Sequence, residues 1–230
     1  MISVIIPALN EAAAIGTALE ALLRLPGDLE ILLVDGSSDD ATVEIASSYR
    51  RVRVIESERG RGTQLREGAL AATGDILWFL HADTIAPAGA ADHIRKALED
   101  PTIAGGNFEL QFGGQSRGAR LLTAIYPHLR KLGLYYGDSG IFTRRTNYEL
   151  AGGFRPHPIF EDLDLVQRLR KTGRFVQAPC RLITSSRRFE HRNFELMFAR
   201  WTALQVLYWA GVSPRILSRM YPSVRHDYKS

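Results

Sequence analysis

Three apolar runs in the first third of this chain each end abruptly in polar or acidic residues. They are Ser3–Glu11 (SVIIPALNE), Glu30–Asp35 (EILLVD) and Ile76–Asp83 (ILWFLHAD). Runs this apolar are typical of strands that are buried on both faces, as in the centre of a parallel sheet. In open α/β sheets, ligands bind just beyond the carboxyl ends of such strands. The chain is therefore predicted to bring Asp35, Asp83 and their neighbours to one edge of a sheet, where they form a binding site.

The composition is that of an ordinary globular protein. The chain has 230 residues, of which 45% are hydrophobic and 23% charged, enough to bury a full core. Because Cys180 is the only cysteine, internal disulfides and multi-cysteine metal sites are excluded and a reducing compartment is indicated. The chain starts directly in a predicted strand, and no run reaches the roughly 18 apolar residues of a membrane span. Neither a signal peptide nor a transmembrane helix is expected.

Charge is distributed unevenly along the chain. The net charge is +4, but residues 161–230 hold 13 Lys or Arg against 6 Asp or Glu. A basic C-terminal portion suits phosphates, an anionic membrane surface or nucleic acid, and a solvated basic surface explains the charge equally well. No nucleic-acid-binding motif is present, so no nucleic-acid partner is expected.

The first hundred residues alternate between strand-like and helix-like segments. Strands are predicted at 2–8, 30–35, 51–57 and 76–82. Helices are predicted at 11–24, 40–49, 62–72 and 87–99. Alternation of this kind is typical of right-handed β-α-β units, and it predicts an α/β fold with a mostly parallel sheet.

The second half of the chain has a mixed pattern. Strand-like segments are expected at 103–113, 140–145 and 174–189, and helices at 117–132 and 161–172. No linker, internal repeat or low-complexity tract interrupts the sequence. Residues 1–230 are therefore predicted to form a single domain.

Residues 193–211 (NFELMFARWTALQVLYWAG) are predicted to form an amphipathic helix, followed by a basic tail to residue 230. The helix has a wide apolar face with arginines on its flanks. Three uses of that face stay open: docking on a membrane surface, formation of a homodimer, and packing against its own domain. The expected location is the cytoplasm, with peripheral contact at the inner face of the membrane if the first use applies.

Four loops are expected to meet beyond the strand ends, the first being Pro7–Glu11. In the second, Asp35–Asp40, carboxylates suit hydrogen bonds to a ribose or to base N–H groups. In the third, Arg59–Gln64, glycines allow backbone N–H groups to approach a phosphate, and Arg61 before a helix adds bidentate contacts. In the fourth, Asp83 suits a hard divalent ion, which on a diphosphate takes one or two carboxylates.

His81 is harder to interpret. One residue separates it from Asp83, so both side chains point the same way if the segment is a strand. It could bind a metal, touch a nucleotide or be a hydrogen-bonded interior histidine. Taken singly, each loop also has a plainer explanation, because helix caps, turns and solvated charges account for most such residues.

Taken in order, six motifs resemble those of the family 2 glycosyltransferases of the GT-A fold. The motifs are SVIIPALNE, VDGSSDDAT, RGRGTQL, ATGDILWFLHADT, GDSGIFTRR and FEDLDLVQRLR. They span roughly residues 2–190, and six ordered motifs are a specific signal. The chain looks most similar to the short, single-domain bacterial members that carry the sequence LHADT.

The resemblance implies a three-layer GT-A sandwich and an inverting transfer of a sugar from a nucleotide-diphosphate donor to an acceptor hydroxyl. It also implies Mn²⁺ or Mg²⁺ as cofactor. Asp83 would match the last carboxylate of the family's D-x-D motif and bind the metal, and Asp138 would accept a hydrogen bond from a sugar hydroxyl. The residues that would bind the nucleotide are Pro7, Ala8, Glu11, Asp35, Ser37, Arg61, Gln64 and His81.

By the same resemblance, Asp162 would be the general base that takes the proton of the acceptor hydroxyl, with Glu161 the second candidate. Arg61 and the metal would neutralise the charge that develops on the leaving diphosphate. A structural explanation holds beside this one, because an acidic first helical turn suits the helix dipole.

Two departures from the family pattern bear on nucleotide binding. The family commonly has D-D-G-S where this chain has a single acid before the glycine, Asp35-Gly36-Ser37. The first position of D-x-D is His81. His191, in RFEHR, is a candidate for a late metal ligand or a surface histidine.

Two other functions stay open at this stage. A nucleotidyltransferase shares the layered architecture, but its glycine-rich loop should follow the first strand, where this chain has Pro7–Glu11. A non-catalytic sugar-nucleotide-binding or scaffold protein of the same fold is the alternative from a different class.

Overall fold

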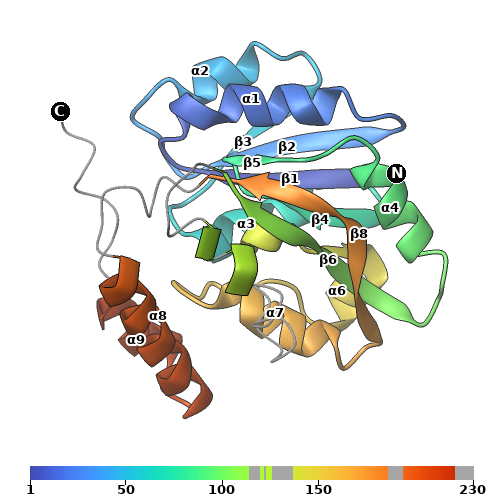
Figure 1. Cartoon of the computed structure of the whole chain (residues 1–230). Helices are drawn as coiled ribbons and strands as arrows, with labels where there is room; N and C mark the ends of the chain where they lie inside the picture. The colour runs from blue at the N-terminus through green and yellow to red at the C-terminus, as the bar shows by residue number, and fades with distance from the viewer. Residues whose placement is uncertain (114–119, 122, 126–136, 186–193, 221–230) are drawn as a thin grey trace.

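The described part of the protein is an eight-stranded sheet covered by helices on both faces (Figure 1). The computed structural model describes residues 1–113, 120–121, 123–125, 137–185 and 194–220. The strands are β1 (Ile2–Ala8), β2 (Leu29–Asp35), β3 (Val52–Glu56), β4 (Ile76–Phe79), β5 (Thr84–Ile85), β6 (Ile103–Phe112), β7 (Phe142–Arg144) and β8 (Arg174–Thr184). The helices are α1 (Ala12–Leu23), α2 (Thr42–Ser47), α3 (Arg61–Ala71), α4 (Ala90–Ala97), α6 (Arg145–Leu150), α7 (Glu161–Leu169), α8 (Phe194–Trp209) and α9 (Pro214–Met220), with a 3-10 turn η1 (Gly137–Ser139).

The sheet order is β3-β2-β1-β4-β7-β6-β8-β5. β1 pairs in parallel with β2 and β4, β2 with β3, and β6 with β8. β7 lies antiparallel to both β4 and β6 and joins the two parallel groups, while β5 runs antiparallel to β8. The predicted α/β fold with a mostly parallel sheet is confirmed. The carboxyl ends of β1, β2 and β4 meet at one edge, as the apolar runs predicted.

Alternating side chains of the central strands supply one hydrophobic core on each face of the sheet. Val4 and Ile6 of β1 pack with Ile15 of α1 on one face. Ile5 packs with Leu65 of α3 on the other, in a core that α6 and α7 also line. Because successive side chains of a strand point to opposite faces, strands this apolar need helices on both sides. The result is a three-layer arrangement, with α1 and α2 above the sheet and α3, α6 and α7 below it in Figure 1.

The strand predicted at 76–82 is shorter than expected. β4 ends at Phe79, which pairs with Ile5 of β1, and the chain then turns. In the turn the Thr84 N–H donates to the His81 carbonyl at 3.1 Å. β5 follows at once and pairs with β8 on the far side of the sheet. His81 and Asp83 therefore do not alternate along a strand, and the turn sets where each side chain lies.

The second half differs from expectation in two places. The strand predicted at 140–145 is β7, three residues long, and an unpredicted helix, α6, follows it directly. The guanidinium of Arg145 holds this helix against the first half by donating to the Gly74 and Ala72 carbonyls at 2.9 and 2.8 Å. The strand predicted at 174–189 ends at Thr184. The helix predicted at 117–132 lies mostly outside the described residues.

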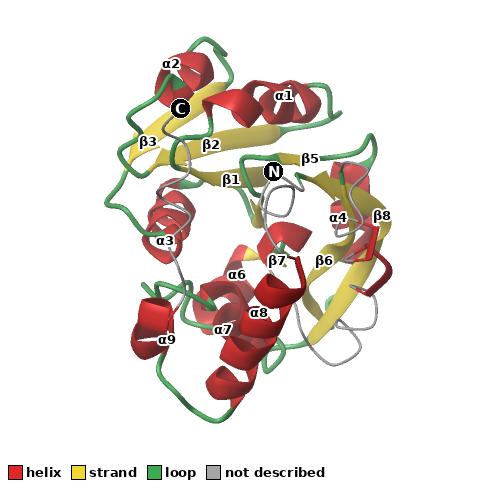
Figure 2. Ribbon diagram, turned by 60° about the vertical axis from the view of Figure 1, so that its left-hand side comes forward, coloured by secondary structure: helices red, strands yellow, loops and turns green. Residues whose placement is uncertain are grey.

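The predicted C-terminal helix is present as α8, and a second short helix, α9, follows it (Figure 2). Leu204 of α8 and Leu217 of α9 are buried in the same hydrophobic cluster as Phe160 and Leu163. Tyr208 stacks on Phe160, with ring centroids 4.7 Å apart. Packing against its own domain, one of the three uses left open, is therefore observed for one face of α8. Among the described residues, no helix combines the length and apolar character needed to cross a bilayer.

Candidate active site at the carboxyl ends of the strands

Hydrogen bonds connect the loop after β1 with the loop after β2, and side chains of both loops take part. The Asn10 amide oxygen accepts a hydrogen bond from the Asp39 N–H at 2.8 Å, and the Asn10 N–H donates to the Ser38 hydroxyl at 2.9 Å. The Asp40 carboxylate accepts from the Ala12 N–H at 3.0 Å. That N–H is one of the donors at the start of α1 that have no partner within the helix. The loops after β1 and β2 are thus held in one arrangement.

Asp35 ends β2 in the position predicted to meet a nucleotide. Its carboxylate is buried and accepts from the Ser38 N–H at 3.0 Å and the Ser38 hydroxyl at 2.5 Å. Ala8, the last residue of β1, lies directly opposite Asp35 in the parallel register, with Pro7 before it. Ser37 is exposed in the loop beyond.

Backbone strain is concentrated in these loops. The three non-glycine residues with positive φ in the described part of the chain are Asn10 (57°), Ser37 (66°) and Phe160 (61°). This left-handed conformation costs an L-residue on the order of 1–2 kcal/mol. Phe160 is held in it by burial and by its stacking on Tyr208. Such strain gathers at functional sites, where the surrounding structure over-determines the backbone.

Arg61, the first residue of α3, connects two loops with the start of α7. Its Nε donates to Glu161, and its Nη2 lies 3.4 Å from the Asp162 carboxylate. Its Nη1 lies 3.3 Å from His81 Nε2. Since a guanidinium can only donate, this ring nitrogen acts as the acceptor and carries no proton. Residues that are 100 or so positions apart in the chain therefore share one polar cluster.

The cluster shifts the pKa values of its members. Burial alone would lower the pKa of the Arg61 guanidinium, but the charges of Glu161, Asp162 and Asp138 outweigh it, and the pKa is raised. Burial raises the pKa of Glu161; the charge of Arg61 opposes that shift and the charge of Asp162 adds to it. The side chain of Glu161 is only 1% exposed, whereas that of Arg61 is 35% exposed. Arg61 is thus a fixed positive charge that a ligand can reach, and Glu161 is its buried partner.

The two glycines of the RGRG segment have structural roles, in addition to the phosphate contact predicted for this loop. Gly60 has φ 144°, which favours glycine, and it directly precedes α3. At Gly62 an added Cβ would lie 2.6 Å from the Arg155 carbonyl oxygen and 3.1 Å from that of His157. The loop before α7 therefore packs against the backbone of the first turn of α3. Close approach of these two segments brings Arg61 to Glu161.

Gly62→Ala is expected to destabilise the protein by about 1–3 kcal/mol, because the new methyl group overlaps a backbone carbonyl that cannot rotate away. Gly16→Ala, in the middle of α1, is the matched control. A Cβ there meets its nearest side chains at 3.7 Å, so the exchange should be neutral or stabilise by up to about 1 kcal/mol. Urea denaturation of both variants measures the difference. Equal effects at the two positions would contradict the close approach.

Gln64 has a structural bonding pattern. It is buried in α3, and its amide nitrogen donates to the Ala8 carbonyl at 2.7 Å and the Val34 carbonyl at 2.8 Å. It therefore fastens α3 to the ends of β1 and β2. The contact of Gln64 with the nucleotide stays a prediction. Its amide nitrogen already donates to the two backbone carbonyls.

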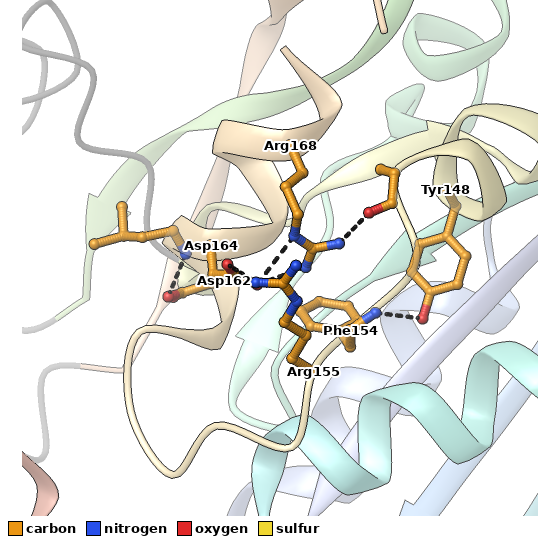
Figure 3. A network of polar contacts seen from close by, with 8 residues as sticks. Tyr148, Phe154, Arg155, Asp162, Asp164 and Arg168 are labelled. Carbon is orange, nitrogen blue, oxygen red and sulfur yellow. Dashed lines mark hydrogen bonds and ion pairs between the residues drawn. The ribbon is translucent and has the colours of Figure 1, made fainter. Parts of the chain in front are cut away.

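A network of arginines and carboxylates holds the loop before α7 (Figure 3). Asp164 forms ion pairs with Arg168 at 2.6 Å and Arg155 at 3.2 Å, and Arg168 also donates to the Ala151 carbonyl. On the same turn, the Asp162 Oδ1 accepts from the Leu163 N–H at 2.8 Å. The network fixes the backbone on both sides of Glu161 and Asp162.

The structure brings four of the predicted site residues into direct contact, namely Arg61, His81, Glu161 and Asp162. Asp138, in η1, is near enough for its charge to act on Arg61. The remaining predicted residues lie at the ends of β1 and β2, in the loops after β1, β2 and β4, or in α3: Pro7, Ala8, Glu11, Asp35, Ser37, Gln64 and Asp83. Their roles in binding stay predictions, and His191 lies outside the described residues.

The residues that hold the loops were not among the predicted site residues. Asn10 and Asp40 connect the first two loops, and Asp164 with Arg168 holds α7. Asn and Asp commonly bond to nearby backbone in turns. The spacing of four between Asp164 and Arg168 is that of an ion pair on one helix face. Both signals were present in the sequence.

Comparison with known proteins identifies the family. The sequence profile of the family described as "Glycosyl transferase family 2" matches residues 3–154. The chain belongs to glycosyl transferase family 2. A PGL/p-HBAD biosynthesis glycosyltransferase of Mycobacterium bovis is 38% identical over 161 residues, which cover 67% of this chain and 52% of that protein. The chain therefore spans about half the length of this relative.

Solved structures share the fold of this chain. Mannosyltransferase PcManGT from Pyrobaculum calidifontis, solved with GDP-Man and Mn²⁺, has a TM-score of 0.67 at 22% identity, covering 90% of this chain and 61% of that one. S. aureus TarS, solved with UDP-GlcNAc, has a TM-score of 0.67 at 17% identity, covering 83% and 60%. The GT-A fold implied by the sequence motifs is thus confirmed for this family 2 chain.

The residues present fit a divalent ion that arrives with a diphosphate. The described residues include no group of three His, Cys, Asp or Glu side chains that could hold a metal by themselves. Asp83 lies partly exposed in the turn after β4. An ion bound to a diphosphate needs only one or two carboxylates, since phosphate oxygens and water complete its coordination. The geometry suits such an ion and not a closed structural metal site.

Proposed function

We propose that this family 2 member transfers a sugar from a nucleotide-diphosphate donor to an acceptor hydroxyl, with inversion at the anomeric carbon. The observation that carries the proposal is the position of Arg61, between the turn of Asp83 and the carboxylates of Glu161 and Asp162. Arg61 is also the first residue of α3, and a helix N-terminus favours anions. A diphosphate at this point would have its sugar facing the start of α7.

In this proposal Asp162 is the general base. Inversion needs one group behind the acceptor hydroxyl that takes its proton as the hydroxyl oxygen attacks the anomeric carbon. Asp162 is at the first turn of α7, within reach of Arg61 but bound to it less closely than Glu161 is. Glu161 is fully buried against Arg61, so we assign it the task of positioning that guanidinium. In this assignment Glu161, the second candidate base, takes no proton from the acceptor.

Arg61 would stabilise the negative charge that develops on the departing diphosphate. Fixed positive charge in a site partly shielded from water is worth more than the same charge in bulk solvent. Mn²⁺ or Mg²⁺ held by Asp83 would supply further neutralisation of the same phosphates. Asp138, whose charge reaches Arg61, would accept a hydrogen bond from a sugar hydroxyl.

The nucleotide would lie over the loops after β1 and β2. Asp35 is the carboxylate at the end of β2, and its predicted partner is the ribose or the base. Pro7, Ala8, Glu11 and Ser37 border the same position. The strained backbone at Ser37 supports a binding role for this loop.

Structural neighbours support the donor class and the metal. PcManGT was solved with GDP-Man and Mn²⁺, and M. tuberculosis glucosyl-3-phosphoglycerate synthase with Mn²⁺, UDP and phosphoglyceric acid. The latter has a TM-score of 0.62 at 22% identity. A thermal-shift panel of UDP-, GDP- and dTDP-sugars with Mn²⁺ tests the proposal and identifies the base, since a ligand that binds only the native state raises Tm. A shift with none of the three would argue against donor binding.

Asp83→Ala is expected to remove the metal dependence of nucleotide binding. In the unmodified protein, affinity for the preferred nucleoside diphosphate should rise when Mn²⁺ is added. In the variant, this Mn²⁺-dependent gain in affinity should fall at least roughly tenfold. Loss of residues that only hydrogen-bond to metal ligands already has an effect of that size. Titration calorimetry with and without Mn²⁺ measures it, and Asp92→Ala, an exposed acid on α4, is the control. Unchanged Mn²⁺ dependence in Asp83→Ala would argue against ligation.

We further propose that residues 1–230 form a single domain located in the cytoplasm.

Slow hydrolysis of the donor by the purified protein, with release of the nucleoside diphosphate, would separate an active enzyme from a scaffold that only binds. A nucleotidyltransferase would instead release pyrophosphate from a nucleoside triphosphate.

A further inference from the structure

Large apolar side chains are unusually exposed on the C-terminal helices. Ten large hydrophobic residues are exposed in the described part of the protein, and half of them belong to α8 and α9. Val206, Trp209 and Ile216 are each 54% exposed and Met220 is 47% exposed. We call these four residues, with the exposed alanines of α8, the outward face. In Figure 1 the two helices lie at the edge of the molecule, away from the sheet.

The outward face of α8 is continuous. Ala199, Ala203 and Val206 of α8 and Ala210 directly after it are spaced by four, three and four residues, which places them on one stripe, and all four are exposed. Trp209 lies beside this stripe. A helix that faces water normally carries charged residues on that side. Between Ala199 and Ala210 this stripe carries no charge, and Glu195 lies one turn before it. An exposed uncharged stripe of this kind favours an apolar partner.

The opposite side of the two helices is anchored. Leu204 and Leu217 are buried, and Tyr208 stacks on Phe160. Arg200 joins α8 to α9 by donating to the Met220 carbonyl at 3.0 Å through Nε. The helices are therefore positioned by the rest of the domain, and the outward face is not the side they use for packing.

Charge distinguishes between the apolar partners that such a face could meet. Within 194–220 the charged residues are Arg200, Arg215, Arg219 and a single acid, Glu195. Arg215 and Arg219 are exposed on α9 beside Ile216 and Met220. In a symmetric dimer through this face, the same arginines of two copies would be brought together, which is unfavourable. An anionic lipid surface complements both the arginines and the apolar side chains.

We propose that the outward face of α8 and α9 docks this protein on an anionic membrane surface, with Val206, Trp209, Ile216 and Met220 in the interfacial layer and Arg215 and Arg219 against lipid headgroups. Trp209 is suited to that layer because its ring is apolar and its N–H is polar. Because Tyr208 contacts Phe160, which directly precedes Glu161 and Asp162, docking would hold the start of α7 near the membrane. The proposal goes beyond the transfer reaction and stands without it.

Flotation of the full chain with lipid vesicles tests the docking directly. Vesicles of phosphatidylcholine alone are compared with vesicles that contain about one third phosphatidylglycerol, at low and at high salt. The protein should float with the anionic vesicles at low salt, and binding should weaken in salt and on the neutral vesicles. Trp209→Ser with Ile216→Ser, and separately Arg215→Gln with Arg219→Gln, should each lower partitioning on the order of tenfold.

Leu70→Ser with Leu150→Ser is the matched control, since these leucines are 69% and 76% exposed on α3 and α6. It should leave vesicle binding unchanged. The proposal is overturned if the unmodified protein stays in solution with anionic vesicles, or if the control lowers binding as much as the outward-face variants. A dimer that Trp209→Ser dissociates, seen by light scattering without vesicles, would overturn it in favour of a second copy. Because the arginine variant changes only exposed residues, it decides the question even if the Trp209→Ser variant folds poorly.

Discussion

Asp162→Asn should lower sugar transfer by about 10²–10⁴-fold while leaving affinity for the nucleoside diphosphate within about threefold. Asparagine has the shape of aspartate, and its one carbonyl oxygen can keep one of the two hydrogen bonds that the Asp162 oxygens accept, from Arg61 or from the Leu163 N–H. It cannot take up the proton of the acceptor hydroxyl. The loss should therefore appear in kcat, with binding preserved. Release of nucleoside diphosphate measures turnover, with water as the acceptor until the natural one is known.

Asp164→Asn is the control for Asp162→Asn, because it changes a buried carboxylate on the same turn of α7. Asp164 pairs with Arg155 and Arg168 and not with Arg61, so its loss should lower stability. Turnover per folded molecule should stay close to that of the unmodified protein. Comparable turnover in Asp162→Asn and the unmodified protein would remove Asp162 as the base. A selective loss in Asp164→Asn would move the base by half a helical turn.

Arg61→Met should destabilise the protein by about 2–3 kcal/mol near neutral pH and also abolish most transfer. Removing one partner of a buried ion pair leaves the other charge uncompensated, which costs about 3–5 kcal/mol for a fully buried pair. The expected loss is smaller here because the Arg61 side chain is 35% exposed and water screens it in part. Loss of a charge that faces the leaving diphosphate should lower kcat by about 10²-fold or more.

The instability of Arg61→Met should depend on pH in a defined direction. Burial already raises the pKa of Glu161 above its ordinary 4.5, and Arg61 opposes that shift, so its removal raises this pKa further. An acid whose pKa is raised in the folded state does not destabilise that state while the acid is protonated. As the pH rises above 4.5, the pKa of the unfolded state, the acid ionises more readily in the unfolded chain, so the free energy of unfolding falls. The stability deficit of Arg61→Met should therefore be small near pH 4.5 and grow toward pH 7.5.

Two further variants decide whether the ion pair explains this loss. Arg61→Met with Glu161→Met should recover most of the stability that is lost through Glu161, since apolar residues of similar volume often replace a buried pair without cost. Asp162 loses its 3.4 Å contact with Arg61 in both variants, so that part of the deficit should remain. The double variant should remain inactive. Arg59→Met, which removes an exposed arginine paired with the exposed Asp39, should cost no more than about 1 kcal/mol. Stability that is not recovered in the double variant, by urea denaturation, would contradict the assignment of Glu161 as the partner of Arg61.

The sequence alone predicted that the carboxyl ends of three strands meet at one edge of the sheet, where the candidate site lies. Burial on two faces can be read locally from the runs that end at Ala8, Asp35 and Phe79, because most of their side chains are apolar. Parallel pairing of β1, β2 and β4 then brings their carboxyl ends together. The ordered motifs added the family, which the matched residues 3–154 confirm.

The tertiary structure decided how the site is held. The contact of Arg61 with Glu161 and Asp162 joins residues about 100 positions apart, and it depends on the loop before α7 packing on Gly62. The turn at His81, the left-handed backbone of Phe160 and the docking of α6 by Arg145 are likewise set by distant contacts. The local sequence pattern predicts whether a residue is buried. It does not predict which segments contact one another, because that depends on how the helices pack across the sheet. For that reason the sequence predicted candidate members of the site, and only the fold showed which of them contact one another.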